Sequence, residues 1–214
     1  VMPGVSSYVR TMFEPRLYRN QAGSDDLVCF RVCVAETDLL VSAQSDQAAR
    51  GFAVVRALRA DIEREIGLDR RFLTSLEPLP TRRGCPPVVQ AMYEAAQQAG
   101  VGPMAAVAGA VAESFARALE PHSAQIVVEN GGDIYIISKV SRVIGIQAGR
   151  SPLSGKFGLR VPPGSLGVCT SSGTVGHSLS FGRADAALIA ADSGAVADAF
   201  ASALGNRVQS AADV

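Results

Sequence analysis

The chain has 214 residues, enough to bury a sizeable core within one domain. Its 48% apolar and 19% charged residues are typical of a globular protein and exclude wholesale disorder. The 20 basic and 20 acidic side chains cancel, whereas broad capture of nucleic acid or of an anionic membrane needs a basic face. We therefore expect no nucleic-acid partner and no membrane partner. With 21 glycines and no tryptophan, the core must rely on backbones that approach closely, and small side chains also leave room for a ligand.

The cysteines and the first residues indicate the compartment. Cys29 and Cys33 share one face of a predicted strand, but at about 13 Å apart they are too distant for a disulfide or a shared metal. Residues 1–10 lack the charged segment and apolar run of a signal peptide, and no stretch approaches the ~20 apolar residues that span a bilayer. We expect a soluble, cytoplasmic protein with reduced thiols.

The first half of the chain alternates strand and helix patterns. Strands are expected at 8–13, 27–35 and 39–43, the last two as a hairpin. Helices are expected from a cap at Ser45 or Asp46 to Ile66, from Pro87 to the residue before Gly100, and over 103–119. The last of these helices is almost wholly apolar, which predicts that it is buried.

The second half is richer in strands. Strands are expected at 126–128, 134–137, 143–146, 166–170, 178–181 and 187–191, with a Gly- and Pro-rich loop before 166 and a closing helix at 194–204. The tight glycine connections favour antiparallel pairing. The prediction is a single α+β domain over residues 1–214, with mixed, mostly antiparallel sheets and packed helices.

The first candidate for function is the turn Asn130-Gly131-Gly132-Asp133 between two apolar strands. Two glycines permit positive φ angles and a close backbone approach. A plain hairpin turn explains the glycines equally well, but it does not require the two polar side chains that flank them.

The second candidate is the loop 169–178, which follows a strand and is dense in hydroxyl and glycine residues such as Thr170 and Ser171. Backbone amides in such a loop can bind a phosphate, although the Walker and dinucleotide-binding glycine patterns are absent. His177 is one of two histidines and suits acid–base catalysis near neutral pH. Cys169 could pair with it as a nucleophile, but a cysteine in a strand is more often part of the core.

The third candidate is the pair Asp198 and Ser202 on the closing helix, which share one face at i and i+4. Their oxygens suit Mg²⁺, with phosphate and water completing its coordination. The alternative is an acidic residue near a helix start and an exposed serine.

Three segments together resemble the ApbE family of Mg²⁺-dependent flavin transferases. Residues 130–133 are similar to its Asn-x-Gly-Gly-Asp turn, and 168–172 stand where members carry Val-Ala-Thr-Ser-Gly. The segment 197–204 is similar to the closing Ala-Asp-Ala-Leu-Ala-Thr-Ala-Leu helix. The match extends over residues 102–205, and the first half resembles a poorly characterised ApbE-related branch.

The resemblance implies an ApbE-like fold that encloses a cleft for FAD or FMN. It implies Asp198 and Ser202 as ligands of Mg²⁺ and His177 as the catalytic base. Asn130, Gly131, Gly132, Asp133, Thr170 and Ser171 would contact the flavin nucleotide. In the transferases a Thr or Ser of an acceptor protein attacks, so the implied partners are a flavin or nucleotide and an acceptor protein.

Departures from the family pattern keep alternatives open. Ala108 stands at the family lysine, Glu113 at its aspartate, and no Asp-Pro follows His177. The chain is interpreted as an FMN-transferase-like enzyme, or alternatively as a non-catalytic flavin- or nucleotide-binding accessory protein, with a link to sulfur assimilation suggested for the branch. A purely structural domain is the third hypothesis, and a homodimer is compatible with the small-residue packing.

Overall fold

The computed structural model describes residues 26–149, 151–173 and 181–214. Six strands form one sheet in the order β1-β2-β3-β4-β7-β8, in which every neighbouring pair is antiparallel. These strands are β1 (Val28–Val34), β2 (Thr37–Ala43), β3 (Ile126–Asn130), β4 (Asp133–Ser138), β7 (Gly164–Ser171) and β8 (Ala187–Ala191). A second sheet pairs β5 (Arg142–Gly145) with β6 (Gly158–Val161).

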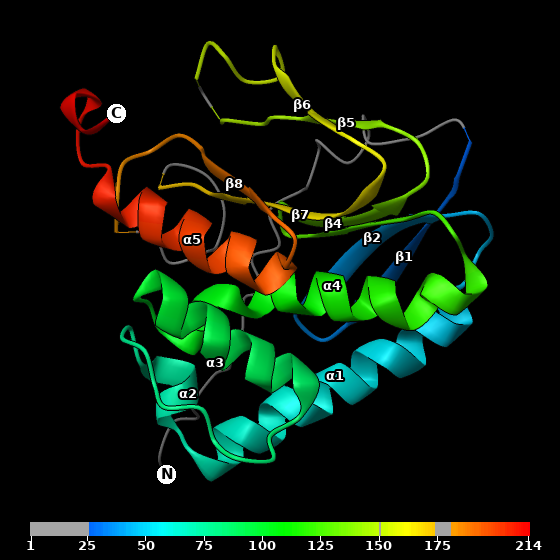
Figure 1. Cartoon of the computed structure of the whole chain (residues 1–214), viewed down its shortest axis with the longest axis horizontal. Helices are drawn as coiled ribbons and strands as arrows, with labels where there is room; N and C mark the ends of the chain where they lie inside the picture. Colours follow the sequence, from blue (N-terminus) through cyan, green and yellow to red (C-terminus); the bar gives the residue numbers. More distant parts are fainter. Residues whose placement is uncertain (1–25, 150, 174–180) are drawn as a thin grey trace, which may run out of the picture.

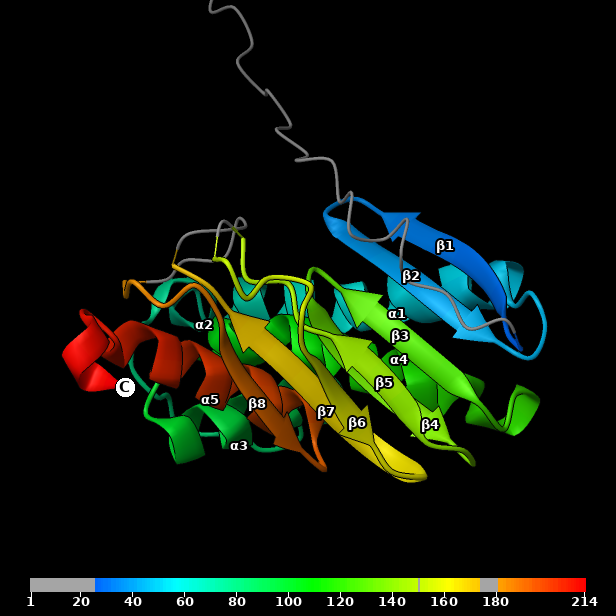
Figure 2. The same cartoon turned by 90° about the horizontal axis from the view of Figure 1, so that it is seen from above.

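The helices cover one face of the six-stranded sheet, and the β5–β6 pair lies over the other (Figures 1 and 2). The helices are α1 (Ala48–Leu68), α2 (Arg71–Thr74), α3 (Pro87–Ala99), α4 (Val107–Leu119) and α5 (Gly194–Arg207). Short 3-10 turns are η2 (Pro103–Ala106), η3 (Glu120–His122) and η4 (Ala211–Asp213). Helix α4 packs on β3 and β4, and α5 packs on β7 and β8. The α+β class with antiparallel sheets and packed helices is thereby confirmed.

The burial pattern explains which strands are central. In β1, Phe30 and Val32 face the helices and are buried, while Cys29, Arg31 and Cys33 alternate with them and are exposed. Both exposed cysteines are free thiols, as the sequence predicts. By contrast β4 is buried on both faces, because Tyr135 and Ile137 belong to the helix side and Ile136 packs against Val161 and Val168 beneath the β5–β6 pair.

Most expected elements are confirmed, and two short ones were missed. Strand β6 lies in the stretch that the sequence predicts as loop, because Gly158 and the two prolines after Val161 hide its alternation. Helix α2, a single turn, was also not expected. The predicted strand at 8–13 lies outside the described residues, as does that at 178–181 except for Phe181, which is not in a strand.

Within the described residues, no single helix is long and apolar enough to cross a membrane. Two segments, Pro87–Ala99 and Pro103–His122, reach that threshold only together, as a pair bent by 106°.

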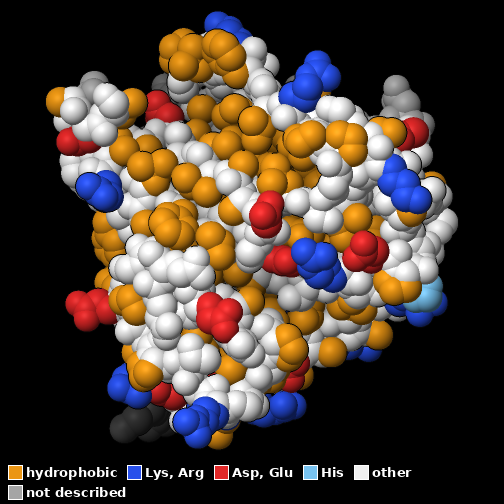
Figure 3. Space-filling model, in the orientation of Figure 1, with side chains coloured by type: hydrophobic (Ala, Val, Ile, Leu, Met, Phe, Trp, Pro, Cys, Tyr) orange, Lys and Arg blue, Asp and Glu red, His pale blue; other side chains and the backbone are white. Residues whose placement is uncertain are grey.

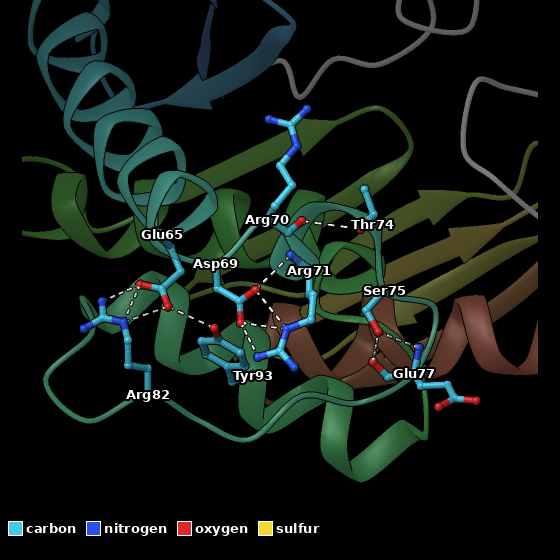
Figure 4. Close-up of polar contacts among 9 residues, drawn as sticks. All are labelled: Glu65, Asp69, Arg70, Arg71, Thr74, Ser75, Glu77, Arg82 and Tyr93. Carbon is cyan, nitrogen blue, oxygen red and sulfur yellow. Dashed lines mark hydrogen bonds and ion pairs between the residues drawn. The ribbon is translucent and has the colours of Figure 1, made fainter.

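A buried ionic contact holds the long loop between α2 and α3 in place (Figure 4). Glu65 of α1 is fully buried, and its carboxylate accepts hydrogen bonds from the Arg82 guanidinium and from the Tyr93 hydroxyl at 2.9 Å. The hydrogen bonds from Arg82 hold the pKa of Glu65 below its ordinary value despite burial. The loop is therefore fastened to both α1 and α3 through one carboxylate.

Replacing Arg82 by methionine should lower the free energy of unfolding, because the buried Glu65 carboxylate loses its charged partner. The deficit should shrink as pH falls below the normal glutamate range, since a lowered folded-state pKa contributes stability only while the group is ionised. Urea denaturation at pH 7 and pH 4 measures both effects. Arg64→Met, which removes an exposed pair with Asp61, is the control and should cost under about 1 kcal/mol. Equal effects of the two substitutions would contradict this account.

Candidate functional site

The predicted site residues gather where one end of the sheet meets α4 and α5. Residue Asn130 ends β3, and Asp133 begins β4 directly opposite it. The two residues between them, Gly131 and Gly132, have φ angles of 69° and 105°. Side chains disfavour this region, so the tight turn requires its glycines. A β-carbon at Gly132 would have no heavy atom within 4 Å, and thus the turn borders open space.

Polar side chains beside this turn fix its conformation and bind it to the start of α4. The Asn130 amide nitrogen donates to the carbonyl oxygen of Ala108 at 3.1 Å. The Glu129 carboxylate accepts from the Gly132 amide at 2.7 Å. These contacts fix the turn, which explains why polar residues flank glycines that a plain hairpin would also use.

Asp133 connects the turn to β7. Its carboxylate accepts a hydrogen bond from the backbone amide of Thr170 at 3.1 Å, and the buried Cys169 thiol lies beside it. Thr170 and Ser171 project to opposite faces of the sheet, because they are consecutive in a strand. The inward residue is Ser171, whose hydroxyl lies 3.0 Å from where a β-carbon on Gly205 of α5 would stand.

Asp198 is a buried residue of α5 that binds the amino terminus of α4. One carboxylate oxygen accepts from the Gly109 amide at 2.9 Å, and the Ala108 amide also stabilises the carboxylate. Free amides at a helix start favour a negative charge, so Asp198 serves as a cap supplied by another helix.

Close backbone contact makes this cap possible. A β-carbon at Gly109 would lie 2.1 Å from the Gly194 carbonyl oxygen, and one at Gly167 would lie 2.7 Å from the Gly194 α-carbon. Any side chain there would push α5 away from α4 or β7. The small residues noted in the sequence thus bring three backbones together around Asp198.

The two aspartates form an electrostatically coupled pair. Burial raises the pKa of Asp198 to about 7, although the α4 amides oppose the shift. Burial and the neighbouring charge of Asp198 both raise the pKa of Asp133 well above its ordinary value. Burial, with the two aspartates, likewise raises the pKa of the Cys169 thiol. The cluster therefore favours bound protons or a cation over two unneutralised carboxylates.

Ser202 lies one turn after Asp198 and is directed at the segment before α4. Its hydroxyl is 3.5 Å from the carbonyl oxygen of Ala105 in η2. A carboxylate, a hydroxyl and a carbonyl oxygen are hard donors of the kind that Mg²⁺ accepts. Among the described residues, no three His, Cys, Asp or Glu side chains are grouped to hold a metal, so any cation here would depend on the mixed oxygen donors.

A second carboxylate fixes the start of α5. Glu113 of α4 accepts from the Gly194 amide at 2.7 Å and from the Ser193 hydroxyl at 3.0 Å. It also pairs with Arg117, whose guanidinium donates to the Tyr135 hydroxyl at 2.6 Å. Glu113 thereby fixes the amino-terminal end of α5. Asp198 lies about one helical turn after this end.

The backbones of all but one of the predicted site residues lie at this end of the sheet, although the Thr170 and Ser171 side chains lie on opposite faces. His177 lies outside the described residues. The sequence did not reveal the Ala105 carbonyl, whose position depends on η2, or the capping role of Glu113. The only sequence signal for the latter was its correspondence to the aspartate in the family pattern. A pocket of about 380 Å³ lined by Glu120 and Lys139 lies at the opposite end of β4 and is separate from this cluster.

Comparisons with known proteins cover most of the chain. The model of a family described as AbpE bacteria matches residues 19–214. UPF0280 proteins from Methanopyrus kandleri and Methanocella arvoryzae are each 43% identical over 178 residues, which is 82% of this chain and 72% of theirs. Another, from Methanocaldococcus jannaschii, is 40% identical over 82% of this chain and 73% of its own.

One solved structure is also similar, the apo form of the Pseudomonas stutzeri flavinyl transferase ApbE. It is 14% identical, with a TM-score of 0.49 and 83% of each chain covered.

Replacing Asp198 by asparagine should alter how stability depends on pH. A carboxyl whose pKa is raised on folding costs stability as pH rises from its ordinary value, near 4, toward about 7. Both proteins are measured with a chelator present. The free energy of unfolding of Asp198→Asn minus that of wild type should therefore increase by a few kcal/mol between pH 5 and pH 8. Urea denaturation at both pH values tests this, with Asp61→Asn on α1 as control. The same pH dependence in wild type and Asp198→Asn would contradict the coupling.

Removing the Glu113 carboxylate should loosen the first turn of α5. Glu113→Ala loses both hydrogen bonds and should cost about 1–2 kcal/mol, whereas Glu113→Gln keeps an acceptor and should cost less. Thermal unfolding gives the stability, and hydrogen exchange of the amides at 194–198 reports the local effect. The control is Glu94→Ala on the exposed face of α3. Unchanged exchange at Gly194 in Glu113→Ala would contradict the capping role.

Proposed function

The chain belongs to the ApbE-related family described as AbpE bacteria, and we propose that it is a Mg²⁺-dependent, flavin-nucleotide-binding enzyme of the flavin-transferase type. The observation that carries the proposal is that Asp198 and Ser202 of α5 both contact the segment 105–109, to which the Asn130 side chain of the glycine turn is also bound. A charged phosphate ester needs a cation and hydrogen-bond donors, and the oxygens of Asp198 and Ser202 would hold such a cation.

The residues present fit a divalent cation. Asp198 and Ser202 would hold Mg²⁺, with the Ala105 carbonyl beside Ser202 as a further oxygen donor. A cation would also relieve the electrostatic cost of two adjacent buried carboxylates, because opposite charge favours their ionised forms. When bound, Mg²⁺ supplies charge stabilisation on phosphate oxygens.

The glycine turn and the end of β7 fit the nucleotide. Gly132 leaves open space beside the backbone, which permits close approach of a ligand. Asn130, Gly131 and Asp133 flank it, the Thr170 amide binds Asp133, and Thr170 and Ser171 place one hydroxyl on each face of β7. We infer that these residues bind FAD or FMN, with Asn130 and Asp133 chiefly fixing the turn.

The proposed reaction divides FAD at its pyrophosphate. A hydroxyl oxygen of an acceptor protein bonds to the phosphorus of the FMN part, the bridging P–O bond breaks, and AMP leaves. His177 takes the hydroxyl proton in this proposal. Asp198 is held in position by the amides of Ala108 and Gly109, which is the preorganisation that such a transfer needs.

The alanine at position 108, where the family pattern has lysine, supports a second candidate function. The chain would then be a non-catalytic flavin- or nucleotide-binding protein. The Ala108 amide contributes to the Asp198 cap and its carbonyl binds Asn130, so the backbone role of this position is intact. What is absent is the charged lysine side chain of the family pattern. Such a protein would bind the nucleotide without converting it, and His177→Ala would leave binding unchanged.

We expect FAD to bind at least tenfold more tightly with Mg²⁺ than in chelator, as measured by quenching of flavin fluorescence. Asp198→Ala should abolish the Mg²⁺ effect, because it removes the only charged donor in the proposed set. Ser202→Ala should weaken the effect, and Ser202→Thr should keep it, since threonine retains the hydroxyl. Release of AMP, with and without a threonine-containing acceptor protein, distinguishes the enzyme from the binding protein.

Matched controls separate the site from general effects. Asp61→Ala removes a partly exposed aspartate from α1, and Ser45→Ala removes an exposed serine hydroxyl. Both should bind FAD like the wild type. Flavin affinity that is independent of Mg²⁺ and unchanged in Asp198→Ala would contradict the metal assignment, and no detectable affinity for flavin would contradict the proposed function itself.

A further inference from the structure

The stretch that leads from β7 to β8 returns to the fold beside the carboxyl end of α5 (Figure 1). Its outgoing limb is 171–173 and its return limb is 181–184, while residues 174–180 lie outside the described part of the chain. The Gly173 amide donates to the Ala184 carbonyl oxygen at 2.9 Å, so the two limbs lie side by side. The outgoing limb continues the end of β7, which carries two of the residues proposed to contact the nucleotide.

The return limb contacts the end of α5 through its backbone. A β-carbon at Gly182 would overlap the Gly205 carbonyl oxygen and would lie 2.9 Å from the carbonyl oxygen of Val208. The Arg183 amide donates to the same Val208 carbonyl at 2.7 Å. A β-carbon at Gly173 would in turn overlap the carbonyl oxygen of Gly182. Both limbs and the end of α5 therefore form one closely packed group of backbones.

Two side chains near the end of α5 bind both main-chain polar groups of Phe181. The Asn206 side-chain oxygen accepts from the Phe181 amide at 2.8 Å. The Gln209 side-chain nitrogen donates to the Phe181 carbonyl at 3.1 Å and to the Asn206 carbonyl at 2.9 Å. The Phe181 side chain itself is 56% exposed. The return limb is thus held by polar contacts of its backbone and not by burial of its aromatic ring.

The turn η4 keeps Gln209 in place. The Asp213 carboxylate accepts hydrogen bonds from the Gln209 amide at 2.9 Å and from the Ser210 amide at 2.8 Å. The Ser210 hydroxyl donates to the same carboxylate at 3.1 Å. These local contacts fold the segment after α5, so the Gln209 side chain starts from a backbone that is already fixed.

The charges on this side of the molecule do not select a phosphate on their own. Figure 3 shows acidic and basic side chains interspersed on the face that it draws, with no broad basic surface. Long-range attraction of an anion needs such a surface. A nucleotide at the end of β7 would therefore depend on single amides, hydroxyls and a cation that are held in the right positions.

We propose that Asn206 and Gln209 are positioning residues of the flavin-nucleotide site, an inference that rests on the proposed function. By holding Phe181 they fix the two limbs against each other, and with them the hydroxyl and amide groups at the end of β7. A loop that is held before binding need not be ordered when the ligand arrives, which removes a cost from the binding free energy. Neither side chain touches the nucleotide in this proposal, since both act through the limbs.

Loss of this anchor should weaken flavin binding. Asn206→Ala and Gln209→Ala should each raise the dissociation constant of FAD in Mg²⁺ a few-fold, and the double variant should raise it roughly tenfold, because a released loop must be ordered when FAD binds. Asn206→Asp keeps an acceptor oxygen for the Phe181 amide and should bind FAD within about twofold of the wild type. Quenching of flavin fluorescence measures each constant.

Two comparisons separate positioning from a general loss of structure. Mg²⁺ should strengthen FAD binding by the same factor in these variants as in the wild type, because Asp198 and Ser202 are untouched. Gln97→Ala is the matched control, since it removes a similar hydrogen bond, to the Leu79 carbonyl at 2.8 Å, that holds a different loop. This control should bind FAD like the wild type. Circular dichroism confirms that each variant is folded, and the single variants carry the test if the double variant does not fold.

Hydrogen exchange locates the anchor without any ligand. In the double variant the amides of Gly173, Phe181 and Arg183 should exchange roughly tenfold faster, while those of Gly109 and Gly194 keep the wild-type rate. Unchanged exchange at the first three amides overturns the anchor. Wild-type affinity for FAD in a variant whose limbs exchange faster overturns its role in binding alone. A wild-type chain that binds no FAD overturns the proposed function, and this role with it.

Discussion

Helices α4 and α5 each supply a carboxylate to the amino terminus of the other. Asp198 of α5 binds the amides of Ala108 and Gly109, and Glu113 of α4 binds the amide of Gly194. Each carboxylate compensates the partial positive charge at a helix start, and each amide offsets part of the cost of burying an anion. Because the exchange is reciprocal, neither helix can shift without breaking contacts at both helix starts. The remaining site residues take their positions from this pair of helices.

The glycines that surround the exchange show why the chain is so rich in small residues. Gly109, Gly167 and Gly194 allow a strand and two helices to touch through their backbones. Only at this separation can a side chain as short as aspartate reach from α5 to the α4 amides. The small residues first suggested space for a ligand. Between α4, α5 and β7 they instead let the backbones approach closely enough to position the Asp198 carboxylate.

Much of the fold was predictable because its signals are local. The hairpin of β1 and β2, the buried α4 and the Asn130–Asp133 turn follow from alternation, helical spacing and paired glycines. Strand β6 was not predictable, since Gly158 interrupts its pattern and its partner β5 lies 13 or more residues earlier in the chain. In the site, residue types identified Asp198, Ser202 and the turn. The Ala105 carbonyl and the Glu113 cap depend on tertiary contacts between segments about 80 to 100 residues apart, and no local pattern encodes these contacts.

The same tertiary contacts link stability to function. Asp133 and Asp198 are buried together, and nothing in their amide contacts supplies a full positive charge. A protein selected for stability alone would replace one carboxylate by an apolar residue, because an uncompensated buried charge is costly. Retaining both is reasonable if a cation or a bound ligand neutralises them when the protein works. The electrostatic cost of two buried carboxylates therefore supports the proposed cation or ligand at this end of the sheet.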